Sequence, residues 1–312
     1  MKPKEKRNII LHKYSKQLET LSFQTEEGEI FYLEDYYICP LCLKTFNLID
    51  LSEEEKDILS LEDIPPKALG GKATLVTCKT CNNTCGHKVD SFLTNELEYR
   101  FGEKKRSSDG QRVILSTGEN KTNAILSIGK EKDLIFHFHG NPKQQQKSLH
   151  LISTLQNYGS NWNLNMTLLA SKEKKRNNFA AKVALLKTAY LFAFERLGYS
   201  YILNDSLTLV REQIFNPGAQ ILHNAFLIDE DNNIPQTLKD GVYIAIINNT
   251  EIVAVLTSYK IFSSGYKYRV MVALPFPDID TDSFYFSLSL LRNADVSQRH
   301  IVIKGIAQCT TT

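Results

Sequence analysis

Two short cysteine pairs constrain this chain more than any other feature of its sequence. Cys39 and Cys42 are separated by two residues, and so are Cys78 and Cys81. This spacing is typical of a tight turn that points two thiolates at one ion. Two such turns complete the tetrahedral four-sulfur shell that zinc prefers in structural sites. The sequence therefore predicts one structural zinc site with these four ligands, in preference to two disulfides or four unrelated buried thiols.

The other two cysteines of the chain, Cys85 and Cys309, do not repeat this spacing. We expect Cys85 to be a buried packing residue and Cys309 to be a free thiol. Cys85 follows Cys81 by four residues, and on a helix both would lie on one side. A role for Cys85 as a substitute ligand therefore stays open.

Length and composition indicate a globular protein of two domains. The chain has 312 residues, of which 42% are hydrophobic, and this is enough for at least one sizeable core. Its 37 basic and 35 acidic residues give a net charge of only +2, so any site for a polyanion must be local. Basic clusters occur at residues 2–7, 104–106 and 172–176, and each taken singly is best interpreted as a solvated segment.

The sequence contains no segment typical of a membrane or export signal. No run approaches the roughly 18 apolar residues of a membrane span, and no long apolar stretch follows the charged residues at the N-terminus. Thiols arranged for metal binding are typical of a reducing compartment. We therefore expect a cytoplasmic protein that does not associate with membranes.

The expected fold class is α+β, with a treble-clef-like zinc module followed by a mixed domain that has an antiparallel sheet and a long core helix. The module with its N-terminal arm is expected at residues 1–105, and the second domain at 110–312. Within the module, we expect residues 1–35 to form an extended arm or a hairpin. A linker to the second domain is expected at residues 102–110. The core helix is expected at 179–198, where apolar residues occur nearly all the way round. Strands are expected at 113–117, 123–128, 134–139, 242–247, 252–259, 266–274 and 300–304.

Two histidines, His137 and His139, lie on one face of the expected strand 134–139 because side chains alternate along a strand. Such a pair could bind a metal or take part in catalysis. No third ligand is visible nearby in the sequence. We therefore favour two partly exposed strand histidines over a metal or catalytic pair.

An ordered set of motifs surrounds the cysteine pairs over about residues 36–95. In order, they are Cys-x-x-Cys, Glu-Asp-Ile-Pro-Pro-Lys, Leu-Gly-Gly, Cys-x-x-Cys-Asn-Asn and Gly-His-Lys-Val-Asp. This arrangement resembles the zinc-stabilised HNH endonucleases, or ββα-metal nucleases. The resemblance implies a hairpin and a helix that hold one divalent metal against the scissile phosphate, while a hairpin histidine activates water. The structural zinc would be separate and would hold only the scaffold.

The resemblance also implies roles for individual residues. Glu62 falls on the acidic position beside the general base, Asp63 on the position of the histidine itself, and Asn82 or Asn83 on the metal-ligating position at the helix start. Asp63 departs from the pattern, since aspartate is a weaker base than histidine by about 2.6 pKa units. This difference costs on the order of 2 kcal/mol in the reaction barrier. A site of Glu62, Asp63 and Asn82 would suit magnesium or manganese, with His87 acting as the base.

Further polar residues accompany these candidates. Asn83, His87 and Asp90 are spaced by four and three residues, so they share one face of the expected helix. Four lysines around the expected site could neutralise phosphates, although each singly is more readily interpreted as a surface residue: Lys67, Lys72, Lys79 and Lys88.

Two functions of different classes follow from the sequence. The leading hypothesis is a metal-dependent HNH-type endonuclease that hydrolyses phosphodiester bonds, with DNA as the favoured substrate and a C-terminal domain that selects substrate or senses a signal. Antiphage defence is a role compatible with that resemblance. The alternative is a catalytically inactive, zinc-scaffolded module that binds nucleic acid or protein. The missing histidine and the near-neutral charge motivate this alternative, and a homodimer or a partner protein is compatible with either function.

Overall fold

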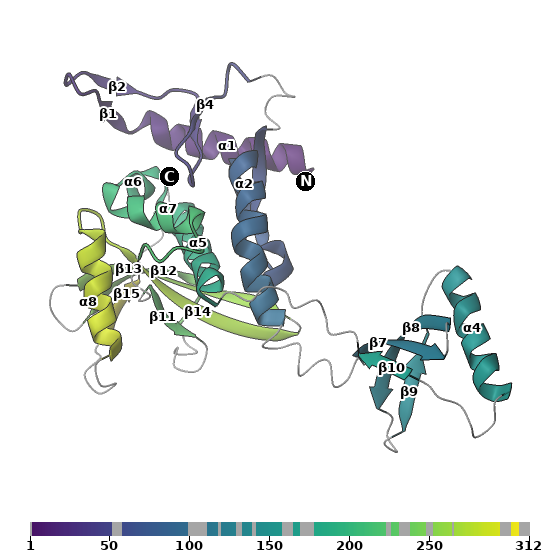
Figure 1. Cartoon of the computed structure of the whole chain (residues 1–312). Helices are drawn as coiled ribbons and strands as arrows, with labels where there is room; N and C mark the ends of the chain where they lie inside the picture. Colours follow the sequence, from purple (N-terminus) through teal and green to yellow (C-terminus); the bar gives the residue numbers. More distant parts are fainter. Residues whose placement is uncertain are drawn as a thin grey trace. The chain divides into compact units, whose positions relative to one another are not determined.

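The computed structural model describes residues 2–51, 58–98, 111–117, 120–128, 133–138, 142–157, 165–168, 178–222, 226–230, 238–247, 252–263, 265–293 and 301–305 (Figure 1). The chain forms two compact units. The main unit combines residues 1–96 with residues 177–312, and the inserted unit comprises residues 97–176. Residues 177–312 therefore belong to the same compact unit as the cysteine-containing segment. The expected linker at 102–110 lies outside the described residues.

Several small antiparallel sheets and a set of helices make up the chain, so the α+β class is confirmed. The largest sheet belongs to the main unit and has the strand order β11-β14-β13-β12-β15. Its strands are β11 (Leu227–Glu230), β12 (Gly241–Ile247), β13 (Ile252–Ser263), β14 (Tyr266–Pro275) and β15 (Ile301–Gly305). The four strands expected in this region are confirmed as β12 to β15. β13 extends four residues beyond the expected end, and the sequence reasoning missed β11.

A long helix, α5 (Asn178–Leu197), packs against this sheet and contacts β11, β12, β13 and β14. Its buried side chains include every residue from Val183 to Leu191, so burial extends over nearly all sides of the helix. The expected core helix is therefore confirmed. Three shorter helices follow in the main unit: α6 (Tyr199–Ile202), α7 (Thr208–Phe215) and α8 (Thr281–Asn293), with a short 3-10 turn, η4 (Asp205–Leu207), between α6 and α7.

The N-terminal segment begins with a helix, α1 (Pro3–Glu19), where the sequence reasoning expected an extended arm. The helix forms because Ile10, Leu11, Tyr14 and Leu18 recur at helical spacing and are all buried. The aromatic ring of Tyr14 stacks on Phe194 of α5, with the ring centroids 4.5 Å apart. After α1, a two-stranded hairpin forms from β1 (Ser22–Gln24) and β2 (Ile30–Tyr32), so the hairpin part of the expectation is confirmed.

Two hairpins and a helix carry the cysteine pairs. β3 (Tyr36–Ile38) pairs with β4 (Thr45–Asn47), and β5 (Leu59–Ile64) pairs with β6 (Lys72–Cys78). A short 3-10 turn, η2 (Lys67–Leu69), connects β5 to β6. Helix α2 (Lys79–Cys85) follows β6 directly and continues through a π-helical turn, η3 (Gly86–Asp90), into helical residues 91–98. The order from β5 onward is therefore strand, turn, strand and helix.

The C-terminal segment of the main unit holds the first cysteine turn through buried tyrosines. The hydroxyl of Tyr199 donates to the carbonyl of Ile38 at 2.6 Å and accepts from the Ile38 amide at 2.9 Å. The hydroxyl of Tyr190 donates to the Pro40 carbonyl at 2.6 Å. These contacts explain why residues 177–312 and the cysteine-containing segment form one compact unit.

The inserted unit is a four-stranded antiparallel sheet with one helix. The strand order is β10-β7-β8-β9, from β7 (Gln111–Thr117), β8 (Asn120–Ile128), β9 (Leu134–His137) and β10 (Asn165–Leu168). Helix α4 (Pro142–Asn157) contacts β8. The core of this unit consists of Val113, Leu115, Ala124 and Leu151, and the partly buried Phe136 and Phe138 pack against it. The three strands expected here are confirmed as β7, β8 and β9.

Of the two strand histidines, His137 is exposed and its Nε2 lies 3.1 Å from the Ser127 hydroxyl. His139 lies outside the described residues. Among the helices that the structure describes, none combines the length and the apolar character needed to span a membrane.

Candidate functional site

The four cysteines of the two pairs converge at one point of the main unit. Their sulfur atoms all lie within 4.8 Å of one another, and the Sγ atoms of Cys42 and Cys78 are 3.8 Å apart. A tetrahedral shell with sulfur atoms at about 2.3 Å from its centre has edges of about 3.8 Å. The four described thiols are free of disulfides. The predicted convergence is confirmed, and the cluster could hold a metal ion.

Two of these sulfur atoms accept hydrogen bonds from backbone amides. The backbone amide of Cys78 donates to Cys39 Sγ at 3.3 Å, and the amide of Cys81 donates to Cys78 Sγ at 3.4 Å. Hydrogen bonding with Cys39 lowers the pKa values of Cys42 and Cys78, whereas hydrogen bonding with the other three thiols and burial raise the pKa of Cys39. For Cys81, hydrogen bonding with Cys39 lowers the pKa, but hydrogen bonding with Cys42 and burial outweigh it and raise the pKa. Thiolates are the form in which cysteine binds metals.

Cys85 is buried next to this cluster but does not belong to it. Burial raises the pKa of its thiol to about 12. A neutral, buried thiol of this kind acts as a small packing residue. Its position agrees with the interpretation of Cys85 as a packing residue, and Cys309 lies outside the described residues.

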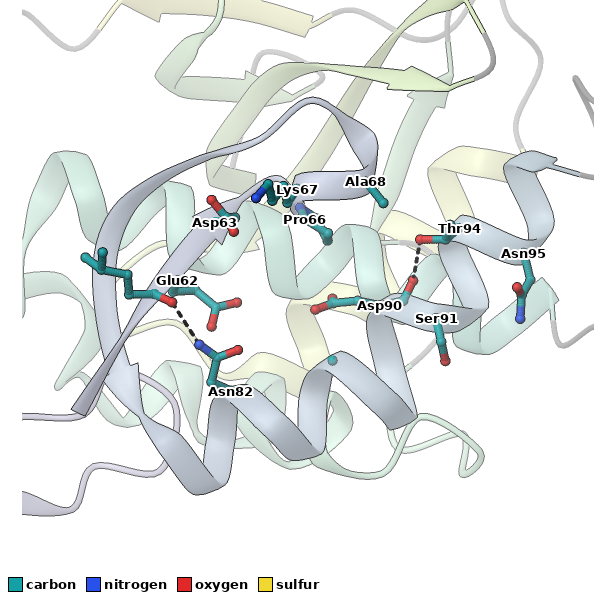
Figure 2. A pocket seen from close by; sticks show the side chains of 12 residues that line it. Glu62, Asp63, Pro66, Lys67, Ala68, Asn82, Asp90, Ser91, Thr94 and Asn95 are labelled. Atoms are coloured by element: carbon teal, nitrogen blue, oxygen red, sulfur yellow. Dashed lines mark hydrogen bonds between the residues drawn. The ribbon is translucent and has the colours of Figure 1, made fainter. Parts of the chain in front are cut away.

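A pocket lies beside the cluster, between the β5–β6 hairpin and the helix that follows it (Figure 2). Three of the residues expected at the site line this pocket: Glu62, Asp63 and Asn82. Asp90 lines it from the helix side, and in Figure 2 its carboxylate points toward that of Glu62. The remaining lining residues are Leu61, Pro66, Lys67, Ala68, Gly86, Ser91, Thr94 and Asn95.

A lysine of α5 completes the polar arrangement at this pocket. The Nζ atom of Lys187 lies 2.7 Å from Glu62 Oε1 and 2.7 Å from Asp90 Oδ2. The side chains of Lys187, Glu62 and Asp90 are only 2%, 4% and 14% exposed. The hydroxyl of Thr77 donates to Glu62 Oε2 at 3.1 Å, so both oxygens of Glu62 have partners within the protein.

The ion pairs shift the pKa values of Lys187, Glu62 and Asp90. Burial acts to lower the pKa of Lys187, but Glu62 and Asp90 outweigh it and raise that pKa above its usual value, so the ammonium remains charged. Burial raises the pKa values of Glu62 and Asp90, and Lys187 opposes this effect. The Oδ1 atom of Asp90 is buried and has no hydrogen-bond partner among the described residues. A buried carboxylate oxygen without a partner is unusual and indicates a position for a cation or a water molecule.

The other predicted residues take different positions. Asn82 uses its amide nitrogen to bind the hairpin, donating to Leu61 O and to Ser60 Oγ at 2.9 Å each, which leaves its Oδ1 as an acceptor. The Asp63 carboxylate lies at the pocket and takes part in none of the described ion pairs. Asn83 and His87 are exposed on the helix and are not among the residues that line the pocket. The structure thus brings together Glu62, Asp63 and Asn82, and not Asn83 or His87.

The turn between β5 and β6 depends on its two glycines. Gly70 has φ +86°, a conformation that other residues adopt only with strain, and a Cβ there would lie 2.7 Å from the ring of Phe262. A Cβ on Gly71 would lie 1.4 Å from the Pro65 carbonyl oxygen. The Gly-Gly pair therefore fixes the turn that carries Pro66 and Lys67 to the pocket.

The sequence reasoning missed Lys187, although its sequence context contains a signal. This lysine lies in the middle of an otherwise apolar stretch of α5, Leu185-Leu186-Lys187-Thr188-Ala189. A lysine is almost never fully buried unless it has a partner, so such a residue in a core helix predicts a buried carboxylate. Which carboxylate it meets could not be read from the sequence.

Comparisons of the chain with family models, with curated proteins and with solved structures found no match.

Proposed function

We propose that the β5–β6 hairpin and the following helix form a zinc-stabilised module of the HNH, or ββα-metal, type, and that the protein is a metal-dependent endonuclease with DNA as its favoured substrate. One observation carries this proposal: Glu62, Asp63, Asn82 and Asp90 surround a single pocket at the junction of hairpin and helix. The strand–turn–strand–helix order and the adjacent cysteine cluster support it.

Zinc is the proposed occupant of the cysteine cluster. Four thiolates in a closed tetrahedral set are typical of structural zinc, and the sulfur separation of 3.8 Å between Cys42 and Cys78 matches such a shell. The two cysteine turns would then make the segment a treble-clef-like scaffold, because the second turn leads directly into α2. The reduced thiols also favour a cytoplasmic location.

A catalytic divalent cation, magnesium or manganese, would be held by oxygen atoms at the pocket. The Oδ1 atoms of Asn82 and Asp90 are the candidates, since both oxygens of Glu62 already have partners and Asp63 is the proposed general base. The unpartnered oxygen of Asp90 is the observation that fits such an ion. When bound, a divalent cation would stabilise the negative charge that develops on the phosphate.

The residues of the chain itself have separate roles in this proposal. Asp63, at the position of the family's histidine, accepts the proton of the attacking water. Lys67 lines the pocket and neutralises a phosphate oxygen of the substrate. Lys187 holds Glu62 and Asp90 in place through its two ion pairs and acts as a positioning residue. Because aspartate is a weak base, we expect slow cleavage.

The test is the conversion of supercoiled plasmid DNA to nicked and linear forms, with magnesium, with manganese or with EDTA. We expect metal-dependent nicking by the wild-type protein and its loss in Asp63→Asn. Asp50→Asn, an exposed aspartate outside the pocket, is the matched control and should cleave normally. His87→Ala separates the two candidate bases, since it should retain activity if Asp63 is the base. Cleavage retained in Asp63→Asn would overturn the assignment.

One observation favours a second candidate, a non-catalytic module that binds nucleic acid. The Lys187 ammonium lies between Glu62 and Asp90, so the protein already supplies a cation to two carboxylates of the pocket. Together with the absence of histidine at position 63, this arrangement is compatible with a module that has kept its fold without cleavage. DNA binding by a zinc-loaded protein that cleaves with neither metal would favour this candidate.

A further inference from the structure

The end of the β13–β14 hairpin in the main unit presents a basic surface that the proposed function has not used. Its last rungs pair Lys260 with Arg269 and Phe262 with Lys267. Side chains two residues apart lie on the same face of a strand, so these four residues share one face. Ile261 lies on the opposite face and is buried.

Positive charge on this face is only partly neutralised. Arg269 is engaged, with Nη2 2.9 Å from Asp240 Oδ1 and Nη1 2.7 Å from Ser258 Oγ. Among the residues that the structure describes, no carboxylate forms an ion pair with Lys260 or Lys267. The positive charge of Arg269 lowers the pKa of Lys260, as do desolvation and, more weakly, Lys267, while Asp240 opposes them. Such a surface favours an anionic partner.

An exposed aromatic ring accompanies the two lysines. Phe262 is 46% exposed, and the Nζ atom of Lys267 lies 5.6 Å from the centre of its ring. Exposed aromatic side chains among basic residues are typical of surfaces that follow a nucleic-acid strand.

This surface is continuous with the rim of the pocket. β13 contacts the turn η2, and the Phe262 ring lies so close to Gly70 that a Cβ there would approach it to 2.7 Å. The same turn carries Pro66, Lys67 and Ala68, which line the pocket (Figure 2). A phosphate chain lying on Lys260 and Lys267 would therefore lie beside the turn that carries Lys67.

We propose that the β13–β14 end, with Lys260, Phe262 and Lys267, binds the phosphate backbone of the nucleic-acid substrate next to the pocket. The inference rests on the proposed function, and it assigns the C-terminal sheet the role of holding the strand. Charge complementarity carries the choice of occupant, since the exposed Lys267 and the partly exposed Lys260, which form no ion pair with the described carboxylates, lie beside an exposed aromatic ring.

The test measures binding of a fluorescent 20-nucleotide DNA, single-stranded or duplex, in buffer without added magnesium or manganese, over a series of salt concentrations. We expect Lys260→Gln/Lys267→Gln to lower the slope of log affinity against log salt by about 1 to 2, since each phosphate contact contributes about 0.7 to 0.9. The matched control, Lys121→Gln/Lys147→Gln, removes the same charge from exposed positions of the inserted unit and should leave the slope unchanged.

Phe262→Leu tests the aromatic ring and keeps an apolar side chain against Gly70. We expect it to weaken binding of single-stranded DNA about fivefold or more, without changing the salt slope. A slope for the double lysine variant equal to that of the wild-type protein would overturn the inference. Equal competition by a polyglutamate peptide of matched charge would also overturn it, because the surface would then fit any acidic polymer.

The two proposals fail in distinguishable ways because binding is measured without added magnesium or manganese. Normal cleavage with an unchanged salt slope in the lysine variant would overturn the surface and leave the nuclease standing. Salt-dependent binding that needs both lysines, with no cleavage in any metal, would support the surface and overturn the nuclease.

Discussion

The cysteine cluster and the carboxylate pocket share the β5–β6 hairpin and the helix that follows it, but their remaining groups come from different parts of the chain. All four cysteines belong to one segment, residues 39–81, and their spacing alone predicts where they meet. The pocket instead needs Lys187, which is 125 residues from Glu62 in sequence. A site made within one segment can be recognised from spacing, whereas a site completed by tertiary structure becomes visible only with the fold.

The largest effect should come from the cysteine cluster. Cys81→Ser removes one of four ligands, and we expect loss of the bound ion and of about 5 kcal/mol or more of stability, since structural zinc contributes on the order of 10 kcal/mol. Metal content and urea unfolding measure both effects. Cys85→Ala is the matched control because Cys85 is equally buried but lies outside the cluster. Cys85→Ala should cost about 1 kcal/mol of stability and leave the ion bound. A comparable loss of stability in both variants would mean that the four cysteines contribute only by packing.

The next effect concerns the buried lysine of the pocket. Lys187→Met leaves Glu62 and Asp90 buried without a counter-ion, and breaking a buried pair in this way costs about 3 to 5 kcal/mol. Urea unfolding of the variant checks this value, with the partly exposed Lys182 of the same helix, as Lys182→Met, for comparison.

A triple variant sharpens that result. Lys187→Met with Glu62→Gln and Asp90→Asn removes all three charges together, and we expect it to recover part of the stability lost in the single variant. No recovery would indicate that Lys187 contributes mainly by packing.

A smaller effect tests whether the cysteine segment also depends on distant residues. Tyr199→Phe removes the hydroxyl that both donates to and accepts from the backbone of Ile38, one residue before Cys39. Leaving these buried groups without partners should cost about 1 to 3 kcal/mol without loss of the bound ion. The exposed Tyr32, changed to Phe, should leave the unfolding midpoint where it is. Loss of the ion in Tyr199→Phe would show that ion binding also depends on residues outside the segment 39–81.

The smallest effects concern two glycines, Gly70 of the β5–β6 turn and Gly86 of the helix, and should have opposite signs. Gly70→Ala places a side chain at φ +86° and against Phe262, which should cost about 1 to 2 kcal/mol. Gly86→Ala adds a methyl group in open space on the helix, which should stabilise the protein by about 0.5 to 1 kcal/mol. Thermal unfolding of both variants measures the difference. Equal shifts would contradict the geometry of the turn.

Much of the fold followed from short-range patterns. Alternation predicted β7, β8, β9 and the strands β12 to β15, and the uniformly apolar stretch predicted α5. Helix α1 was missed because its buried residues are separated by many charged ones, so that the segment resembled a solvated arm. The resemblance placed Glu62, Asp63 and Asn82 at one pocket, but it could not indicate that Lys187 would reach Glu62. That contact depends on how α5 packs, which no local pattern encodes.

The division of the main unit into residues 1–96 and 177–312 has a consequence for how the protein is made. During synthesis, all four cysteines leave the ribosome about 100 residues before Lys187. At 5 to 20 residues per second, this interval lasts roughly 5 to 20 s. If the cysteine cluster binds zinc as proposed, it can do so while Glu62 still lacks its counter-ion, and the inserted unit is completed in the meantime. The order of the chain would then set an order of events, in which the ion organises the first hairpins before α5 supplies the ammonium that pairs with Glu62 and Asp90.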